Sequence, residues 1–350
     1  MLSQPLYETF YRYRTLQTDR ISSLPIVILM PHSACNCRCV MCDIWKGNSR
    51  LKQLKGKDVE NVLQSLKKLR TKQVVMSGGE ALLNPDFFSL CEILKKEGLA
   101  ITLLSTGLTI KKNADAILKW TDELIVSLDG DEETHDAIRN IEGAFAKLKE
   151  GVQYIKSKNP GFRITARTVI HRLNFRKWGG IIEAAKEIGV DRISFLPADV
   201  SSQAFNREVS WPEKRQMEVA VNCDELSDFK IVLEDVIETY ENEIQTGFIA
   251  EPAEKIKRLF TYYCALQGLC DFPYKKCNAP WVSTVIEPDG AVRPCFFHAS
   301  LGNIHNHSLT EILNGEKGVG FRKMLNMDEN DTCKRCVCYL NLPAGMNPIK

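Results

Sequence analysis

Short apolar runs rich in β-branched residues alternate along the first two hundred residues with segments whose apolar side chains recur every three or four positions. Runs of the first kind predict buried strands, and segments of the second kind predict amphipathic helices. Residues 59–69 and 145–155 show the helical period clearly. We therefore expect six strands, at residues 25–30, 73–77, 100–105, 124–128, 164–170 and 192–196.

Six strand–helix units in succession indicate an α/β fold with a parallel sheet and helices on its outer face. Because six units are too few to close an eight-stranded barrel, we expect a partial (β/α)6 TIM-like barrel. This core covers residues 24–204 and follows an N-terminal extension at residues 1–23.

Polar and glycine residues follow the predicted strands at their carboxyl ends, where parallel α/β sheets place their sites. A cysteine cluster follows the first strand. We expect five loops to converge on one rim, and these loops contain the cysteine cluster, Ser77-Gly78-Gly79-Glu80, Ser105-Thr106-Gly107, Ser127-Leu128-Asp129-Gly130 and Phe195-Leu196-Pro197.

Composition and charge exclude several classes of protein. The chain has 350 residues, of which 44% are hydrophobic and 26% charged, and its net charge is +2. This balance is ordinary for a globular protein and gives no basic field for nucleic acid. The apolar run at residues 24–30 is too short to span a membrane, and no signal-peptide pattern precedes it. We therefore expect a cytoplasmic protein that binds neither nucleic acid nor membrane.

Thirteen cysteines stand out against this background. A long chain without an export signal uses cysteines as metal ligands, catalytic groups or buried apolar residues more often than as disulfides. Four of them fall at residues 35–42 and seven after residue 260. Cys91 and Cys223 lie apart from both groups in helical patterns, and we expect both to be buried core residues.

The first group places Cys35, Cys39 and Cys42 with three and then two residues between them. Three thiolates hold three irons of a [4Fe–4S] cluster and leave the fourth iron open for chemistry. A structural zinc site that also uses Cys37 is the alternative. Zinc ligands usually come as separated pairs, which disfavours it.

The triplet, with the hydrophobic Met41 before its last cysteine, resembles the signature loop of the radical S-adenosylmethionine (SAM) superfamily. The resemblance covers residues 24–200. It implies that the amino and carboxylate groups of SAM chelate the open iron, and that reductive cleavage of SAM yields methionine and a 5′-deoxyadenosyl radical. Cys37 is additional to the family pattern and is not expected to bind iron.

The same resemblance implies contacts between the strand ends and SAM. Gly78, Gly79 and Glu80 match the segment that receives the methionine ammonium group. Arg167, within the fifth strand, is a candidate for the methionine carboxylate, with a strand-to-helix salt bridge as the alternative. The full set of expected SAM contacts is Met41, Gly78, Gly79, Glu80, Ser105, Ser127, Asp129 and Arg167, with Thr106 beside Ser105.

The second cysteine group surrounds a predicted β-hairpin at residues 282–286 and 291–292, with Pro288-Asp289-Gly290 at its turn. A hairpin brings its ends together, so Cys277 and Cys295 should be neighbours. The close pair Cys333 and Cys336 completes four thiolates, a set that both iron–sulfur clusters and zinc accept.

This segment, residues 263–350, resembles the SPASM and twitch extensions of radical enzymes, and its spacing suits the twitch form with one auxiliary [4Fe–4S] cluster. Cys264, Cys270 and Cys338 leave a second auxiliary cluster, or an exchanged ligand, open. Residues 205–262 form a charged helical bridge. Trp211-Pro212-Glu213 is the expected start of its first helix, and the bridge can cover the open side of the barrel.

The resemblance implies an enzyme whose radical abstracts hydrogen from a substrate that is then oxidised or rearranged. An auxiliary cluster would accept an electron or bind the substrate, and flavodoxin or ferredoxin would supply electrons. We expect a small metabolite such as a sugar derivative. The alternatives are a peptide or protein substrate and, in another class, a non-radical iron–sulfur or zinc protein. No acid or base is assigned, and the candidates by position are Asp199, Tyr262, Tyr263, Arg293 and His298.

Overall fold

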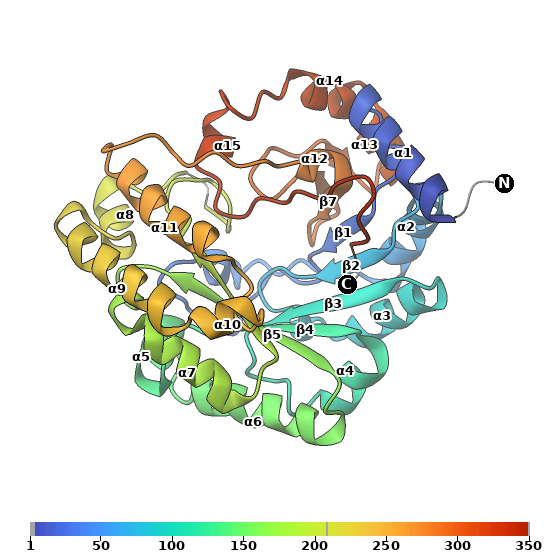
Figure 1. Cartoon of the computed structure of the whole chain (residues 1–350). Helices are drawn as coiled ribbons and strands as arrows, with labels where there is room; N and C mark the ends of the chain where they lie inside the picture. The colour runs from blue at the N-terminus through green and yellow to red at the C-terminus, as the bar shows by residue number, and fades with distance from the viewer. Residues whose placement is uncertain (1–3, 208, 349–350) are drawn as a thin grey trace.

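One mixed sheet organises the computed structural model of the chain, which describes residues 4–207 and 209–348. Its strand order is β6-β5-β4-β3-β2-β1-β7-β8-β9 (Figure 1). The first six strands are β1 (Ile26–Leu29), β2 (Gln73–Met76), β3 (Ala100–Ser105), β4 (Glu123–Ser127), β5 (Arg163–Ile170) and β6 (Arg192–Pro197). The others are β7 (Ser283–Ile286), β8 (Ala291–Arg293) and β9 (Gly302–Asn303).

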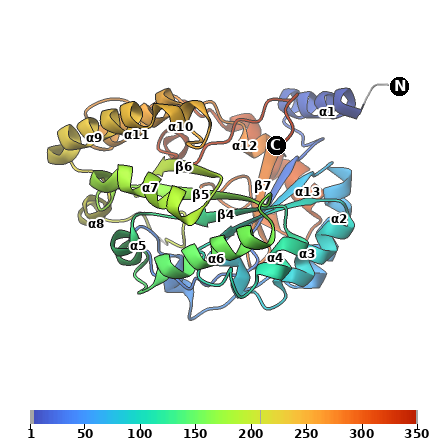
Figure 2. The same ribbon diagram turned by 60° about the horizontal axis from the view of Figure 1, so that its bottom comes forward.

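Strands β1 to β6 pair in parallel in the order of the sequence. Helices between them cover the outer face of the sheet (Figure 2). These helices are α2 (Gly56–Lys68), α3 (Phe87–Lys96), α4 (Ala114–Trp120), α5 (Glu132–Arg139), α6 (Ala144–Lys158) and α7 (Trp178–Ile188). The predicted α/β partial barrel is therefore confirmed, and each predicted strand end lies within one residue of the observed one.

The core forms between the outer face of the sheet and the apolar stripes of these helices. On α2, Val59, Val62 and Leu66 are almost fully buried, as their helical spacing predicts. Trp178, the first residue of α7, is fully buried and packs edge-on against Phe195 of β6. Packing of this kind fixes the strands rigidly, so the loops at their carboxyl ends have defined positions.

The C-terminal hairpin continues the main sheet. Strand β7 pairs in parallel with β1, in the register Ile26↔Ser283, and antiparallel with β8. At the turn, Gly290 has φ +80°, a left-handed conformation that glycine tolerates. The predicted hairpin is thus confirmed, although its attachment to the open edge of the barrel is not evident from its own residues.

The bridge lies at the other edge of the sheet and consists of α8 (Glu213–Val219), α9 (Leu226–Thr239), α10 (Glu241–Gln245) and α11 (Ala253–Leu266). Helix α8 begins after Pro212, as predicted. Ile193 of β6 bridges in parallel to Ile249, which fastens the bridge to the sixth strand. Among the described helices, none is both long and apolar enough to cross a membrane.

The remaining helices belong to the N-terminal extension and to the segments next to the hairpin (Figure 1). They are α1 (Gln4–Thr18), α12 (Ala279–Val282), α13 (Leu309–Asn314), α14 (Glu316–Met324) and α15 (Asp331–Lys334). Cys91 is fully buried in α3, as predicted. The same prediction for Cys223 is wrong, because this residue opens a short 3₁₀ turn on the surface and is exposed.

Candidate active site

The cysteine loop that follows β1 is held by the end of helix α5. The backbone N–H groups of Arg38 and Val40 donate to the carbonyl oxygens of Arg139 and Ile138, each at 3.0 Å. The last carbonyls of a helix have no partner within the helix, so α5 offers them to the loop. A segment without regular secondary structure thereby obtains a fixed path.

The thiols of this loop are close enough to influence one another. Burial, together with the neighbouring Cys39 and Cys35, raises the pKa of Cys42 to about 12. The thiol of Cys37 is 1% exposed and lies beside Cys35 and Cys39. A crowded, largely buried set of soft thiol donors fits an iron–sulfur cluster, whose binding displaces the thiol protons.

The two glycines after β2 let the chain pass close to this loop. A Cβ atom at Gly79 would lie 2.1 Å from the carbonyl oxygen of Ala34. Gly78 has φ +114°, and the N–H of Glu80 donates to the Ala34 carbonyl at 2.9 Å. The glycines are therefore required by the contact between the second strand end and the cysteine loop.

The carboxylate of Glu80 is fully buried and lies against the end of β3. It accepts hydrogen bonds from the Thr106 N–H and hydroxyl, both at 2.7 Å, and from the Ser105 hydroxyl at 3.1 Å. Burial raises its pKa, while these hydrogen bonds act in the opposite direction. The Thr106 hydroxyl also lies 3.0 Å from the Oδ1 of Asn36, which joins the third strand end to the cysteine loop.

The end of β4 reaches the loop through a buried ion pair. Asp129 is fully buried, and its carboxylate lies 2.5 Å from the guanidinium of Arg139. A second guanidinium nitrogen of Arg139 donates to the Sγ of Cys39 at 3.4 Å. Asp129 therefore stabilises the positive charge of Arg139, whose guanidinium contacts the predicted iron ligand Cys39.

The loop after β6 encloses the cysteine loop from another side. Arg207 is buried, donates to Asp199 at 2.8 Å and reaches the carbonyl oxygen of Met41 at 3.4 Å. The indole N–H of Trp211 donates to Asp43 at 2.7 Å. Asp199, named from its position as an acid or base, is thus committed to a buried ion pair.

All five predicted loops therefore meet at one rim, the carboxyl edge of β1–β4 and β6. Arg139 and Arg207 were not identified from the sequence. Each lies outside a recognisable motif, and only the fold brings its guanidinium to the cysteine loop. Ser105 and Ser127 end their strands at the same edge, as predicted, and Met41 is 9% exposed within the core.

Arg167 lies on the other side of the site. It is the fifth residue of β5, and although this strand pairs with β4 on one side and β6 on the other, the Arg167 side chain is exposed. Its Nε donates to the Ser194 hydroxyl at 3.3 Å. An exposed side chain in the middle of a buried sheet faces an open interior, so Arg167 and Ser194 mark the lumen of the partial barrel.

The second cysteine group also comes together. Burial raises the pKa of Cys295 to about 12, with Cys333 and Cys277 contributing, and Cys295 in turn lies near Cys336. The four thiols named from the sequence are therefore neighbours. His298 joins them, with its Nε2 3.4 Å from the Sγ of Cys333. These donors are of the soft type that iron–sulfur clusters and zinc accept. Among the described residues, however, no three of them are arranged around a single metal ion.

The two cysteine groups lie at opposite ends of the strands, one at the carboxyl ends and the other at the amino ends. The radical-type triplet follows β1, whereas Cys277 precedes β7, which runs parallel to β1 in register. Cys295 follows β8, which runs antiparallel, so it returns to the same amino edge. A strand of four residues spans about 13 Å. The lumen lies between the two groups.

Cys264 and Cys270 do not join this set. Burial raises the pKa of Cys264, and the thiols that add to the effect are Cys270 and Cys223. Cys264 lies in the last turn of α11, Cys270 in the irregular segment after that helix, and Cys223 in the 3₁₀ turn before α9. The structure thus groups Cys264 and Cys270 with the exposed Cys223, while Cys338 is exposed beside Cys336.

The remaining acid or base candidates have structural partners. The hydroxyl of Tyr263 donates to the carbonyl oxygen of Ile170 at 2.5 Å, and that of Tyr262 donates to Ala198 at 3.2 Å. Arg293 pairs with Glu287 at 2.9 Å. Each of these side chains supports a loop or strand near the site.

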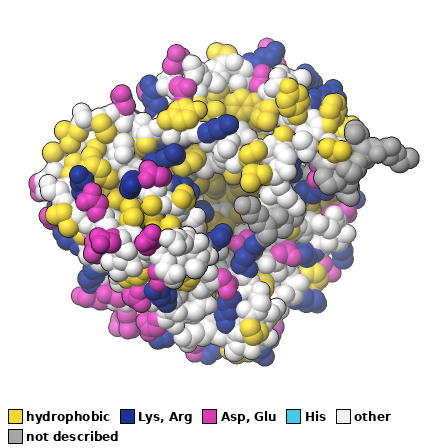
Figure 3. Space-filling model, in the orientation of Figure 1, with side chains coloured by type: hydrophobic (Ala, Val, Ile, Leu, Met, Phe, Trp, Pro, Cys, Tyr) yellow, Lys and Arg dark blue, Asp and Glu magenta, His cyan; other side chains and the backbone are white. Residues whose placement is uncertain are grey.

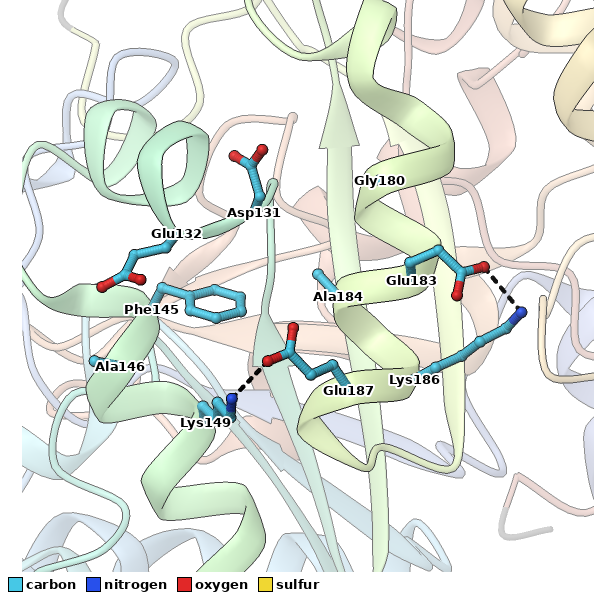
Figure 4. A pocket seen from close by; sticks show the side chains of 10 residues that line it. All are labelled: Asp131, Glu132, Phe145, Ala146, Lys149, Gly180, Glu183, Ala184, Lys186 and Glu187. Carbon is cyan, nitrogen blue, oxygen red and sulfur yellow. Dashed lines mark hydrogen bonds and ion pairs between the residues drawn. The ribbon is translucent and has the colours of Figure 1, made fainter.

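A large groove on the outer helical face is remote from this chemistry. Its walls come from α5, α6 and α7, and Figure 4 shows the ion pairs Lys149–Glu187 and Lys186–Glu183 along it. The groove encloses about 770 Å³, but none of its lining residues comes from a carboxyl strand end of β1–β3 or from the cysteine groups. It is a gap between packed helices.

Two family models match the chain in the regions that carry this geometry. Residues 29–185 match the radical SAM superfamily, and residues 277–337 match the SPASM iron–sulfur cluster-binding domain. The first region contains the cysteine loop and the rim loops that follow β2, β3 and β4, and the second contains all four auxiliary thiols.

Known proteins show the same relationship over most of the chain. Fe-coproporphyrin III synthase of Methanosarcina barkeri is 26% identical over 348 residues, which cover 89% of this chain and 80% of that protein. Mycofactocin maturase MftC of Mycobacterium tuberculosis is 25% identical over 333 residues, covering 91% and 76%. The structure of Streptococcus suis SuiB bound to S-adenosylmethionine superposes with a TM-score of 0.65 at 15% identity, covering 96% of this chain and 79% of that one. The chain is an enzyme of the radical SAM superfamily with a C-terminal SPASM iron–sulfur domain.

Proposed function

We propose that this enzyme oxidises or rearranges a small metabolite bound in the barrel lumen, between the two cysteine groups. The supporting observation is their placement, with Cys35, Cys39 and Cys42 at the carboxyl edge of the sheet and the auxiliary thiols at its amino edge. A substrate in the lumen lies between a source of radicals and an acceptor of electrons.

We assign Cys35, Cys39 and Cys42 as ligands of the radical [4Fe–4S] cluster, leaving one iron for SAM. When bound together, cluster and SAM supply the 5′-deoxyadenosyl radical that abstracts hydrogen. Gly78 and Gly79 bring the second strand end against the loop, which gives SAM backbone groups to bind.

The polar residues of the rim then orient SAM. We assign Glu80 as the residue that binds the methionine ammonium group of SAM. Hydrogen bonds from Ser105 and Thr106 hold the Glu80 carboxylate in place. Ser127 ends β4 at the same edge. The contacts of Asp129 with Arg139 favour a positioning role for Asp129 over direct contact with SAM.

We assign Cys277, Cys295, Cys333 and Cys336 to one auxiliary [4Fe–4S] cluster. Its place at the far side of the lumen suits removal of the second electron from a substrate radical, which completes a two-electron oxidation. An external donor such as flavodoxin or ferredoxin would reduce the first cluster. The cytoplasmic location expected from the sequence suits such a donor and stays a prediction.

A small substrate is favoured by the similarity to the relative whose name specifies coproporphyrin. That similarity extends over most of both chains. A sugar derivative, expected from the sequence, is likewise a small molecule. A peptide is the second candidate, because mycofactocin maturase MftC is similar over a comparable share of the chain.

The experiment is anaerobic reconstitution with iron and sulfide, followed by reduction with dithionite in the presence of SAM. About eight irons per chain and release of methionine and 5′-deoxyadenosine are expected. Cys39→Ala should abolish the cleavage, whereas Cys91→Ala, which changes a thiol buried in α3, should retain it. A chain with eight irons that does not cleave SAM would refute the proposal.

A further inference from the structure

A cavity between the barrel lumen and the auxiliary cysteines collects positive charge. Arg167 of β5 enters it from the sheet, Lys255 and Arg258 from α11, and Lys275 from the loop before Cys277. Glu251 is the only carboxylate among its described lining residues. Figure 3 shows the hollowed face that carries α11 and α15, with Lys and Arg side chains around the opening.

One of these cations belongs to the auxiliary loop. The ammonium group of Lys275 donates to the carbonyl oxygens of Lys334 and Cys336, both at 2.6 Å. Burial lowers its pKa, while the neighbouring thiols act in the opposite direction. Lys275 thus ties the chain around two auxiliary thiols to the wall of the cavity.

The other three cations, Arg167, Lys255 and Arg258, have few carboxylate partners within the protein. Lys255 lies 3.3 Å from Glu251, which also accepts the Phe195 N–H at 2.9 Å. Within residues 4–207 and 209–348, Arg167 and Arg258 make no salt bridge with a carboxylate. Both guanidinium groups are exposed at a cavity whose described lining has four cations and one carboxylate. This excess of positive charge favours an anionic occupant, because arginine binds carboxylates through two parallel hydrogen bonds.

We infer that this cavity receives carboxylate groups of the substrate, which is therefore a small polycarboxylate. The inference rests on the proposed function, because it places this substrate in the same lumen. The cavity encloses about 100 Å³, a few times the volume that one water occupies in the liquid. It accommodates a carboxylate-bearing arm, while the reacting carbon lies further into the lumen towards the radical cluster.

The test uses coproporphyrin III, which carries four carboxylates, and its uncharged tetramethyl ester as fluorescent probes. Each is titrated against the reconstituted full-length enzyme. The acid should bind saturably and at least tenfold more tightly than the ester. Lys255→Gln with Arg258→Gln should weaken binding of the acid by about a hundredfold, because each of the two lost charge-assisted contacts removes about one decade of affinity.

Lys257→Gln is the matched control on the same helix. Lys257 pairs with Glu254 at 2.8 Å and does not line the cavity, so its variant should bind the acid like the wild type. Circular dichroism and iron content check that the double variant is folded. Equal affinity for acid and ester, no saturable binding of the acid, or full binding by the folded double variant would overturn the inference.

SAM cleavage separates this inference from the proposed function. If the wild-type enzyme forms 5′-deoxyadenosine but does not prefer the acid to the ester, the proposed radical function stands and the inference of a polycarboxylate substrate is wrong. Reconstituted wild type that forms no 5′-deoxyadenosine would refute the proposed function, whatever the probes show.

Discussion

Arg139 shows how single buried side chains adjust the chemistry of this site. Its guanidinium lies between the carboxylate of Asp129 and the thiol of Cys39, and all three groups are largely buried. In such surroundings a charge is weakly screened, so it acts strongly on its neighbours. Hydrogen bonds to the ligand sulfurs are one means by which proteins set the potential of an iron–sulfur cluster.

We expect Asp129→Asn with Arg139→Gln to lower the reduction potential of the radical cluster by about 60 to 130 mV, the equivalent of one charge-assisted hydrogen bond. The guanidinium favours the more negative, reduced cluster, so its removal disfavours reduction. The double change avoids leaving Asp129 as an unpaired buried charge. An EPR-monitored redox titration measures the shift.

Arg176→Gln is the control, because Arg176 pairs with Glu225 and Asp228 away from the loop. An unchanged potential in a double variant that keeps its iron would show that Arg139 serves only to hold the loop.

Cys37 lies among the predicted ligands, although family spacing assigns it no iron. Its burial is that of a core residue. We expect Cys37→Ala to keep the full iron content and SAM cleavage, at a cost of about 1 kcal/mol in the free energy of unfolding. Cys35→Ala, Cys39→Ala and Cys42→Ala should each abolish cleavage. Iron analysis and chromatography of 5′-deoxyadenosine measure these outcomes. Loss of SAM cleavage in Cys37→Ala would mean that Cys37 belongs to the iron ligands.

At the scale of elements, the cysteine loop is held from several sides by different pieces of secondary structure. The end of α5 supplies carbonyl groups, the second strand end passes under Ala34, and the loop after β6 reaches Met41 through Arg207. A long loop with few hydrogen bonds of its own depends on such neighbours for its shape. Disturbing one contact should therefore disturb the iron site.

Gly79→Ala tests this dependence. The new Cβ would lie 2.1 Å from the Ala34 carbonyl oxygen, so the loop must move. We expect a loss of about 1–3 kcal/mol in the free energy of unfolding and a lower iron content at the first site. Denaturant unfolding and iron analysis measure both.

Gly180→Ala provides the comparison. Apart from its chain neighbours and the backbone of its own helix α7, no atom of the described residues lies within 4 Å of a Cβ at Gly180. It should leave the iron content unchanged and stabilise the protein by about 0.5–1 kcal/mol. Equal behaviour of the two variants would contradict the role of Gly79.

At the scale of the whole molecule, two cysteine groups far apart in sequence share one sheet. The SPASM hairpin extends the sheet at β1, and the helical bridge is attached at β6, so both edges of the partial barrel are covered. The lumen between them is the space that both clusters can serve. Under the proposed function, this arrangement would separate formation of the radical from completion of the reaction.

The double variant Cys277→Ala with Cys333→Ala should therefore lose about four of eight irons. It should still form 5′-deoxyadenosine when no substrate is present. Product formation from the true substrate should be lost, because the second electron has no acceptor. Iron analysis and product chromatography check this outcome. Since metal binding can stabilise a small domain, solubility and the first cluster must be verified. Normal product formation would leave the auxiliary cluster a structural role.

The reciprocal variant, with Cys35, Cys39 and Cys42 all changed to Ala, should retain about four irons at the auxiliary thiols and cleave no SAM. A folded variant without iron would show that the C-terminal cysteines bind zinc or no metal.

The strands, the hairpin and the two cysteine groups could be predicted from the sequence, because each depends on local patterns. Alternating apolar runs select strands, Pro288-Asp289-Gly290 suits a turn, and the spacing of Cys35, Cys39 and Cys42 is itself the motif. The convergence of five loops followed from the general rule for parallel sheets. These features need no knowledge of contacts between distant residues.

Only the tertiary structure decided which side chains act on one another. Glu80 is enclosed by Thr106, and Arg139 contacts Cys39 one hundred residues away in sequence. Cys223, predicted to be buried, is exposed because it begins a short 3₁₀ turn before α9 and does not lie on the apolar face of a helix. The sheet edge chosen by the hairpin, and the cationic cavity that results, depend on packing between segments that share no local pattern.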